Sequence, residues 1–292
     1  MSLNRLVKRE FQPYISYNNV IWNNITMPRI RRGFLGFFIF LLSVPFEWSV
    51  AQDLGTRPLQ KLVDCPTAGG PATGSYDFEL RAYPGGGLLA GISVGLFQRF
   101  TVGMSYGGSG VIGYAAPDWN PQPGVAAAFR IINESPLLPA LAIGFTNQGY
   151  GSYLDSLDRY QFKAKGFYAV AGKYFAWGGA GETGFHFGAN RNTGETGEKK
   201  VDLFLAADYW PTRQLAVIAE YSAALDDWRG DGSFGMGRGY LNAGLRWSFG
   251  ERLAVDLNLR DLLNNQEEAL RGGSQIGREV RISYVEELGI TN

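Results

Sequence analysis

Two short strings are the part of this sequence that most resembles a catalytic motif. Residues 91–95 and 103–107 both match G-x-S-x-G, which presents a nucleophilic serine where a strand turns sharply into a helix. Each string lies inside, or at the end of, a run of alternating residues that is typical of a strand. Small residues at every second position generate the pattern by chance, so a plain strand is the preferred interpretation.

The other candidates for chemistry are one histidine and two loops. His186 is the single histidine and could act as a general base, but glycines flank it along its own face and no serine lies two positions away. The G-x-G-x-x-G string at 179–184 has no helix after it to bind a phosphate. Asp226, Asp227 and Asp231 share a loop, where a solvated acidic loop is preferred over a calcium site. We therefore predict no catalytic residue, no metal ligand and no cofactor.

Composition narrows the class of protein. Lys and Arg number 27, and Asp and Glu also number 27, so no net charge attracts nucleic acid. Cys65 is the only cysteine, which excludes an intrachain disulfide and, with one histidine, a zinc cluster of cysteines and histidines. The 40 glycines and 14% aromatic residues favour many short strands over helices.

The strands are indicated by strict alternation of side-chain character. In residues 76–82 every second side chain is apolar and those between are charged, which is a period of two rather than 3.6. The same pattern recurs along the chain and predicts about twelve antiparallel strands. We place them at 76–82, 88–96, 100–106, 125–131, 141–146, 162–175, 183–188, 201–209, 215–221, 241–249, 253–260 and 280–284.

One face of these strands is apolar and the other carries charge. Ionised side chains on a short strand need water or each other, so a polar interior and an apolar exterior are expected. This predicts an all-β, antiparallel, up-and-down transmembrane β-barrel of about twelve strands spanning 75–288. The polar residues expected to face the lumen are Asp77, Glu79, Arg81, Arg130, Lys163, Lys165, His186, Asp202, Asp208, Glu220, Arg246, Asp256, Arg260 and Arg281. They form either a mutually paired filling or a polar pathway, and both interpretations stay open.

The connections between the strands alternate in length. If the first strand runs outward, almost every outside connection is long and every connection at the other end is short, as in bacterial outer-membrane barrels. This pattern predicts that the N- and C-termini are periplasmic. The preceding sequence reads as a signal peptide at 27–51, with arginines, a short apolar core and a small-x-small cleavage site. Residues 1–26 are expected to be an upstream misassigned segment, and 52–74 a periplasmic lead-in or a plug at the barrel mouth.

Several short strings, namely 66–68, 119–124, 139–151, 167–173, 219–221 and 241–246, resemble the barrel region of YjbH-like outer-membrane proteins of exopolysaccharide and capsule production. The resemblance implies a barrel that helps polysaccharide leave the cell, with outer-membrane lipid and polysaccharide or polysaccharide-export proteins as partners. It implies no catalytic residue. The alternatives are a general porin-like channel for small polar solutes and a barrel enzyme acting on lipid or peptide.

Overall fold

The computed structural model describes residues 59–114, 116–177, 179–197, 199–227, 235–266 and 276–287, all of which belong to the compact unit Ser49–Asn292. The predicted upstream segment at 1–26 and the signal peptide at 27–51 lie outside the described residues, as do the first part of 52–74 and the end of the predicted barrel at 288. No helix in the described ranges has the length and apolar character needed to cross a membrane.

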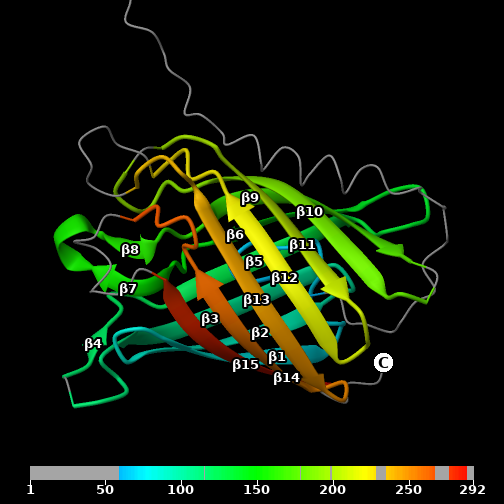
Figure 1. Ribbon diagram of the computed structural model, residues 1–292, viewed down its shortest axis with the longest axis horizontal. Coiled ribbons are helices and arrows are strands. Elements are labelled where there is room, and N and C mark those ends of the chain that lie inside the picture. The colour runs from blue at the N-terminus through cyan, green and yellow to red at the C-terminus, as the bar shows by residue number, and fades with distance from the viewer. Residues whose placement is uncertain are drawn as a thin grey trace, which may run out of the picture. The chain divides into compact units, whose positions relative to one another are not determined.

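Twelve strands pair in one closed antiparallel ring, which confirms the predicted fold class (Figure 1). Each strand pairs with the next along the ring, and the last strand pairs with the first from Ser75↔Glu287 to Ala82↔Val280. Closure leaves no free edge among these twelve strands. The strands are β1 (Ser75–Tyr83), β2 (Gly87–Leu96), β3 (Phe100–Ser109), β5 (Gly124–Ile132), β6 (Ala140–Thr146), β9 (Gly166–Ala176), β10 (Glu182–Arg191), β11 (Asp202–Trp210), β12 (Leu215–Ser222), β13 (Tyr240–Phe249), β14 (Leu253–Arg260) and β15 (Gly277–Glu287).

Three further strands lie outside the ring. The short β4 (Asp118–Trp119) pairs only with β3, and β7 (Tyr150–Leu154) pairs with β8 (Arg159–Phe162) in a separate hairpin that contains the 3-10 turn η1 (Asp155–Leu157). We call β7–β8 the cover hairpin. The expected strand at 162–175 was therefore wrong at its start. The chain enters β9 through Gly166, whose φ of 65° few other residues adopt, so the preceding alternation belongs to a link.

The side chains of the ring separate as the alternation predicts. On β14 the apolar Leu257 and Leu259 are 55% and 43% exposed, whereas Asp256 and Asn258 between them are 0% and 1% exposed. The same contrast holds on β10, where Phe187 is exposed and His186 is buried. A one-residue slip in register would exchange the two faces, so the pattern fixes the pairing. The outer surface is consequently an apolar belt, and the charged side chains of the strands lie on the inner surface.

The two ends of the barrel differ in their connections. Residues 97–99, 133–139, 177–181, 211–214 and 250–252 join strands at one end, and the chain enters β1 and leaves β15 at that same end. The longer connections at 110–123, 147–165, 192–201, 223–239 and 261–276 lie at the opposite end. We refer to these as the short-turn end and the long-loop end. The cover hairpin belongs to the long-loop end.

The apolar belt predicts that the outer face of the barrel contacts lipid. Leu257→Arg, at the middle of β14, should destabilise the barrel in lipid bilayers by about 2–4 kcal/mol if this face meets hydrocarbon. Leu137→Arg is the matched control, because Leu137 is 87% exposed in a short turn outside the strands. Denaturant unfolding from liposomes measures both. Equal effects of the two substitutions would contradict a lipid-facing belt.

Candidate functional site

The interior of the ring is filled by a segment that precedes the first strand. Residues 59–70, which we call the plug segment, turn back on themselves through the Lys61↔Pro66 bridge. Leu62 and Val63, near the tip of this turn, are 0% exposed. The segment hydrogen-bonds to side chains of β1, β2, β5, β12, β14 and β15, which lie all around the ring. Only a position inside the barrel satisfies these contacts together.

The plug segment packs on an apolar half of the lumen. Its Leu62, Val63, Cys65 and Ala68 form one buried cluster with side chains of β6, β9, β11 and β12. The wall members of that cluster are Ala140, Ala142, Val170, Phe204, Ala206 and Ile218. Small alanines on the wall leave room for the segment inside a ring of twelve strands.

The opposite half of the lumen is a row of arginines. Arg246, Arg260, Arg281 and Arg81 come from β13, β14, β15 and β1, and we call them the arginine wall. Asp256 is 0% exposed and accepts hydrogen bonds from Arg246 Nε at 2.6 Å and from Arg281 Nε at 2.5 Å. Buried charges require such partners, because desolvation of an unpaired ion is very costly.

The tip of the plug segment reaches the arginine wall through Asp64. Arg81 Nη1 donates to Asp64 Oδ1 at 3.1 Å, and Arg260 Nη2 donates to Asp64 Oδ2. Arg81 and Arg281 also donate to the carbonyl oxygen of Val63. Burial raises the pKa of Asp64, but the charges of Arg260 and Arg81 outweigh it and hold that pKa below its ordinary value. Asp64 is therefore ionised at neutral pH.

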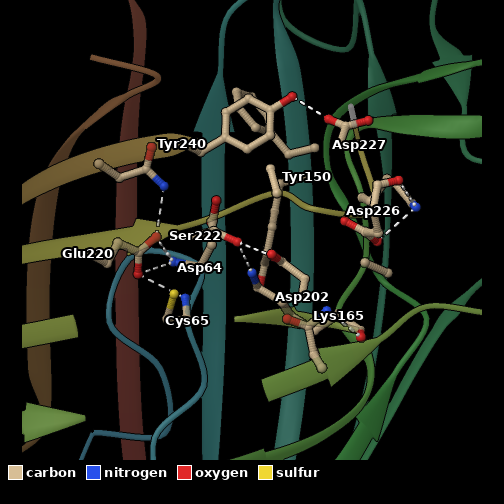
Figure 2. Close-up of a pocket in the computed structure, with 16 residues that line it drawn as sticks. Asp64, Cys65, Tyr150, Lys165, Asp202, Glu220, Ser222, Asp226, Asp227 and Tyr240 are labelled. Carbon is tan, nitrogen blue, oxygen red and sulfur yellow. Dashed lines mark hydrogen bonds and ion pairs between the residues drawn. The ribbon is translucent and has the colours of Figure 1, made fainter. Parts of the chain in front are cut away.

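A second anchor holds the backbone of the same turn. The carboxylate of Glu220 on β12 accepts N–H bonds from Val63, Asp64 and Cys65 at 2.8–3.1 Å, and a fourth from Asn242 Nδ2 at 2.8 Å. Figure 2 shows Glu220 facing Asp64 and Cys65. Successive N–H groups in a tight turn form a concave anion site, and here the anion is a wall side chain.

The cover hairpin closes the other side of this site. The ring of Tyr150 lies 4.3 Å from the guanidinium of Arg81, and the ring of Phe162 lies 4.3 Å from that of Arg260. Arg159 forms an ion pair with Asp227, whose other oxygen accepts a bond from Tyr240. The hairpin and the plug segment thus meet on the same two guanidiniums.

A small cavity of about 40 Å³ remains between the plug segment, the cover hairpin and the strands β11, β12 and β13. It is lined by Asp64 and Cys65 of the plug, Tyr150 and Phe162 of the hairpin, and Lys165, Asp202, Glu220 and Ser222 (Figure 2). This space holds roughly one or two water molecules. It is too small for an organic solute while the plug is seated.

The predicted lumen residues divide into three groups. The first group lies on strands of the ring and is buried, and it comprises Arg81, His186, Asp202, Asp208, Glu220, Arg246, Asp256, Arg260 and Arg281. Asp77, Glu79 and Arg130 lie on strands and are partly exposed. Lys163 and Lys165 lie in the link before β9, not on a strand as expected, and both reach the cavity. Four further interior residues were not among those predicted to face the lumen, namely Phe204, Gln60, Asp64 and Glu279.

His186 and the two serines of the G-x-S-x-G strings lie in three different places. His186 Nε2 is 2.9 Å from Asp208 Oδ1, and Tyr174 packs edge-on against its ring. Ser93 donates to Gln60 of the plug segment, and Ser105 donates to Gln148. Both serines lie within strands rather than at a strand-to-helix turn. No serine is among the contacts recorded for His186 in the described residues.

Lys165, Ser222 and Asp202 form a buried chain of polar groups beside the cavity. Lys165 Nζ donates to Ser222 Oγ at 3.0 Å, and Ser222 Oγ donates to Asp202 Oδ2 at 2.6 Å. Burial lowers the pKa of Lys165, but Cys65 and Asp202 raise it and the net pKa is above the ordinary value. Lys165 is therefore a fixed ammonium and cannot serve as a base for Ser222.

The acidic loop after β12 departs from its expected role. Asp226 and Asp227 are 5% and 4% exposed, so the expected solvated loop was wrong for these two residues. Asp226 pairs with Lys163 at 2.8 Å and Asp227 pairs with Arg159. Each carboxylate compensates a cation carried in by the link or the hairpin. Asp231 lies outside the described residues.

Solved structures with a similar fold are outer-membrane proteins of low sequence identity. The "KdgM porin" is 13% identical, with a TM-score of 0.42, and the match covers 72% of this chain and 98% of that one. The Acinetobacter baumannii outer membrane protein Omp33 is 11% identical over 72% of this chain and 96% of its own, with a TM-score of 0.41. The "NanC porin" is 10% identical over 73% and 98%, with a TM-score of 0.40.

No protein-family model matches the chain, and no curated protein matches it in sequence. The resemblance of short strings to YjbH-like proteins is therefore not confirmed. The assignment of a closed barrel comes from the strand pairing itself, from Ser75↔Glu287 onward.

The second anchor can be tested with the single cysteine, which is 1% exposed in the plug segment. Glu220→Gln replaces an ionised acceptor by a neutral amide, so the plug should leave its seat more often. We expect maleimide labelling of Cys65 to accelerate about tenfold, the size of one charge-assisted hydrogen bond.

Burial, followed by the charge of Glu220, raises the pKa of the Cys65 thiol, so the substitution also changes thiol ionisation. Labelling is therefore compared at one near-neutral pH, and the rate of each folded protein is divided by its rate in denaturant, where the surroundings of the thiol are the same in both. Glu286→Gln is the control, because Glu286 pairs with Arg252 at the end of β15, away from the plug. Equal rates for the two variants would contradict the anchor.

Proposed function

We propose that this protein is an outer-membrane, porin-like channel for small polar solutes, and that the plug segment holds it closed in the state described here. The observation that carries the proposal is the closed ring with an apolar outer face and a charged inner face, as on β14. A soluble barrel has no need of an apolar belt, whereas a membrane barrel cannot exist without one.

The closed state follows from the contents of the lumen. Val63 and Leu62 are fully buried at its centre, and the cover hairpin places Tyr150 and Phe162 on the arginine wall from the long-loop end. A cavity of about 40 Å³ is no path for a solute. Passage therefore requires the plug segment, the hairpin or both to move.

The contacts that hold the plug segment are of a kind that can be exchanged. Its polar anchors, Asp64 and Glu220, form ion pairs and hydrogen bonds that water or a solute can replace. Three of the six wall residues in its apolar cluster are alanines, which offer little area per residue. A removable segment supports a channel better than a permanently filled lumen does.

The location and sidedness are part of the proposal. An apolar belt on a closed antiparallel ring, short turns at one end and long loops at the other support the outer membrane of a Gram-negative-type bacterium. The short-turn end, where the chain enters β1 and leaves β15, would face the periplasm. The plug segment then enters from the periplasmic side and the cover hairpin from outside.

A second candidate is the passage of exopolysaccharide, which the resemblance to YjbH-like proteins suggests. The strings at 119–124 and 139–151 that carry this resemblance lie on or beside the long loops. Loss of surface polysaccharide after deletion of the gene would favour it. Unchanged polysaccharide together with measured conductance would leave the general channel.

Planar-bilayer recording tests the channel directly. The natural protein should be closed most of the time, and a variant weakened at both anchors, Asp64→Asn with Glu220→Gln, should raise the open fraction at least about tenfold. Asp208→Asn with Glu286→Gln is the matched control. It makes the same two chemical changes at carboxylates whose hydrogen-bond partners, among the described residues, lie outside the plug segment.

Heat-modified migration on gels shows whether each variant has formed a barrel. A folded double variant that conducts no better than the control would contradict the proposed channel. Conductance of the natural protein equal to that of the double variant would contradict the plug as the closing element.

A further inference from the structure

The carboxylate of Asp64 is held in the manner of a bound ligand. Its two oxygens are bound by two different guanidiniums, Oδ1 by Arg81 and Oδ2 by Arg260. These arginines come from β1 and β14, which lie on either side of β15 in the ring. Two guanidiniums that converge on one carboxylate are a common way for a protein to bind an anion.

Without Asp64 the two arginines would lose one of their counter-charges. The wall supplies them jointly with one carboxylate, Glu279, which lies 3.2 Å from Arg81 Nη1 and 3.0 Å from Arg260 Nη1. Glu79 lies 3.4 Å from Arg81 Nε but is shared with Lys61 and Arg281. When the plug segment leaves, Lys61 and Asp64 leave together, so these two charges cancel, but Arg81 and Arg260 each lose an acceptor in a largely buried place.

The guanidiniums of Arg81 and Arg260 are also preorganised by their neighbours. Tyr150 and Phe162 lie against the two guanidiniums at 4.3 Å, which fixes their planes. Arg260 Nε is buried and has no hydrogen-bond partner among the described residues, so this arginine retains one unused donor. A site with an unused guanidinium donor favours a further anionic group.

A route for a solute to reach this pair begins at the cavity. Asp64, Tyr150 and Phe162 all line it, and so do Lys163 and Lys165 of the link before β9 (Figure 2). These lysines add positive charge near the long-loop end, although Asp226 and Asp202 lie beside them. Asp64 lines the cavity but Arg81 and Arg260 do not, so an anion in the cavity reaches the two guanidiniums only when Asp64 moves aside.

We propose that Arg81 and Arg260 form a binding site for a carboxylate-bearing solute, that the plug segment occupies this site with its own Asp64, and that a solute carboxylate which replaces Asp64 favours the open lumen. The inference deepens the proposed channel by naming a solute class and the contact it exchanges. Asp64 and the solute compete for the same two guanidiniums, so each weakens the binding of the other.

The first test uses the natural protein and needs no substitution. Acetate and acetamide have nearly the same shape, but only acetate carries a charge. Acetate should accelerate the labelling of Cys65 in a saturable way, whereas acetamide and sodium chloride at equal ionic strength should not. An equal acceleration by chloride would mean that screening alone loosens the plug, and would overturn the inference.

The second test measures binding directly, by calorimetry on the detergent-solubilised barrel. Asp64→Asn removes the internal competitor, so acetate should bind roughly tenfold or more tightly than to the natural protein. Asp208→Asn is the control, because it also removes one carboxylate from the lumen, and the hydrogen-bond partners of Asp208 in the described residues, His186 and Trp210, lie outside the plug segment. Adding Arg260→Gln to Asp64→Asn should abolish the gain.

These results separate the inference from the proposed function. Acetate that binds Asp64→Asn no better than Asp208→Asn overturns the carboxylate site, even if the double-anchor variant conducts. Tight, Arg260-dependent binding supports the site even if no conductance is found, and the channel alone then fails. Affinity for acetamide equal to that for acetate would also overturn the site.

Discussion

The structure depends on the rule that a charge buried inside a closed ring must meet an opposite charge or a full set of hydrogen bonds. The strand pattern directs many ionised side chains inward, because the outer positions are apolar. Some of these charges satisfy each other on the wall, as Asp256 does with Arg246 and Arg281. Others lack enough partners on the wall, and the groups that supply the missing hydrogen bonds and opposite charges are the ones that fill the lumen.

Glu220 and the pair Arg81 and Arg260 are where the wall alone falls short. Glu220 has Asn242 as its wall partner and takes three further hydrogen bonds from the plug backbone. The two arginines have Glu279 and take the second carboxylate from Asp64. One turn of the plug therefore supplies donors to an anion and an acceptor to two cations. The anion Glu220 and the cations Arg81 and Arg260 lie on different strands. The turn can satisfy all of them in one orientation only.

Much of the barrel was predictable from sequence, because alternation with a period of two reports directly on which face of a strand is wet. The strand at 253–260 was placed at the bounds the structure has, and Asp256 and Arg260 were assigned to the lumen. The start of β9 was misplaced because Lys163 and Lys165 continue the alternation through a link that is not paired in the ring. A local pattern cannot distinguish a paired strand from an extended link.

The plug contacts were beyond sequence reasoning for a different reason. Residues 59–70 show no period, and the partners of Asp64 lie in β1 and near the far end of the chain, so no local signal connects them. The same holds for Tyr150, whose contact with Arg81 depends on the folding of a long loop into the lumen. The unequal numbers of cations and anions on neighbouring strands would indicate that the wall needs a further partner. This inequality can be seen only when the strand pairing is known.

The division of the lumen into an apolar half and a charged half indicates where control of the plug can lie. Moving Leu62 and Val63 from their cluster into water costs about 1.5–3 kcal/mol for each side chain, and no polar solute reduces that cost. The charged half differs, because a solute or water can take over the contacts of Asp64 and Glu220 without leaving a buried ion bare. The apolar half therefore stabilises the closed state in all conditions. The charged half determines how far a solute can shift the equilibrium toward the open state.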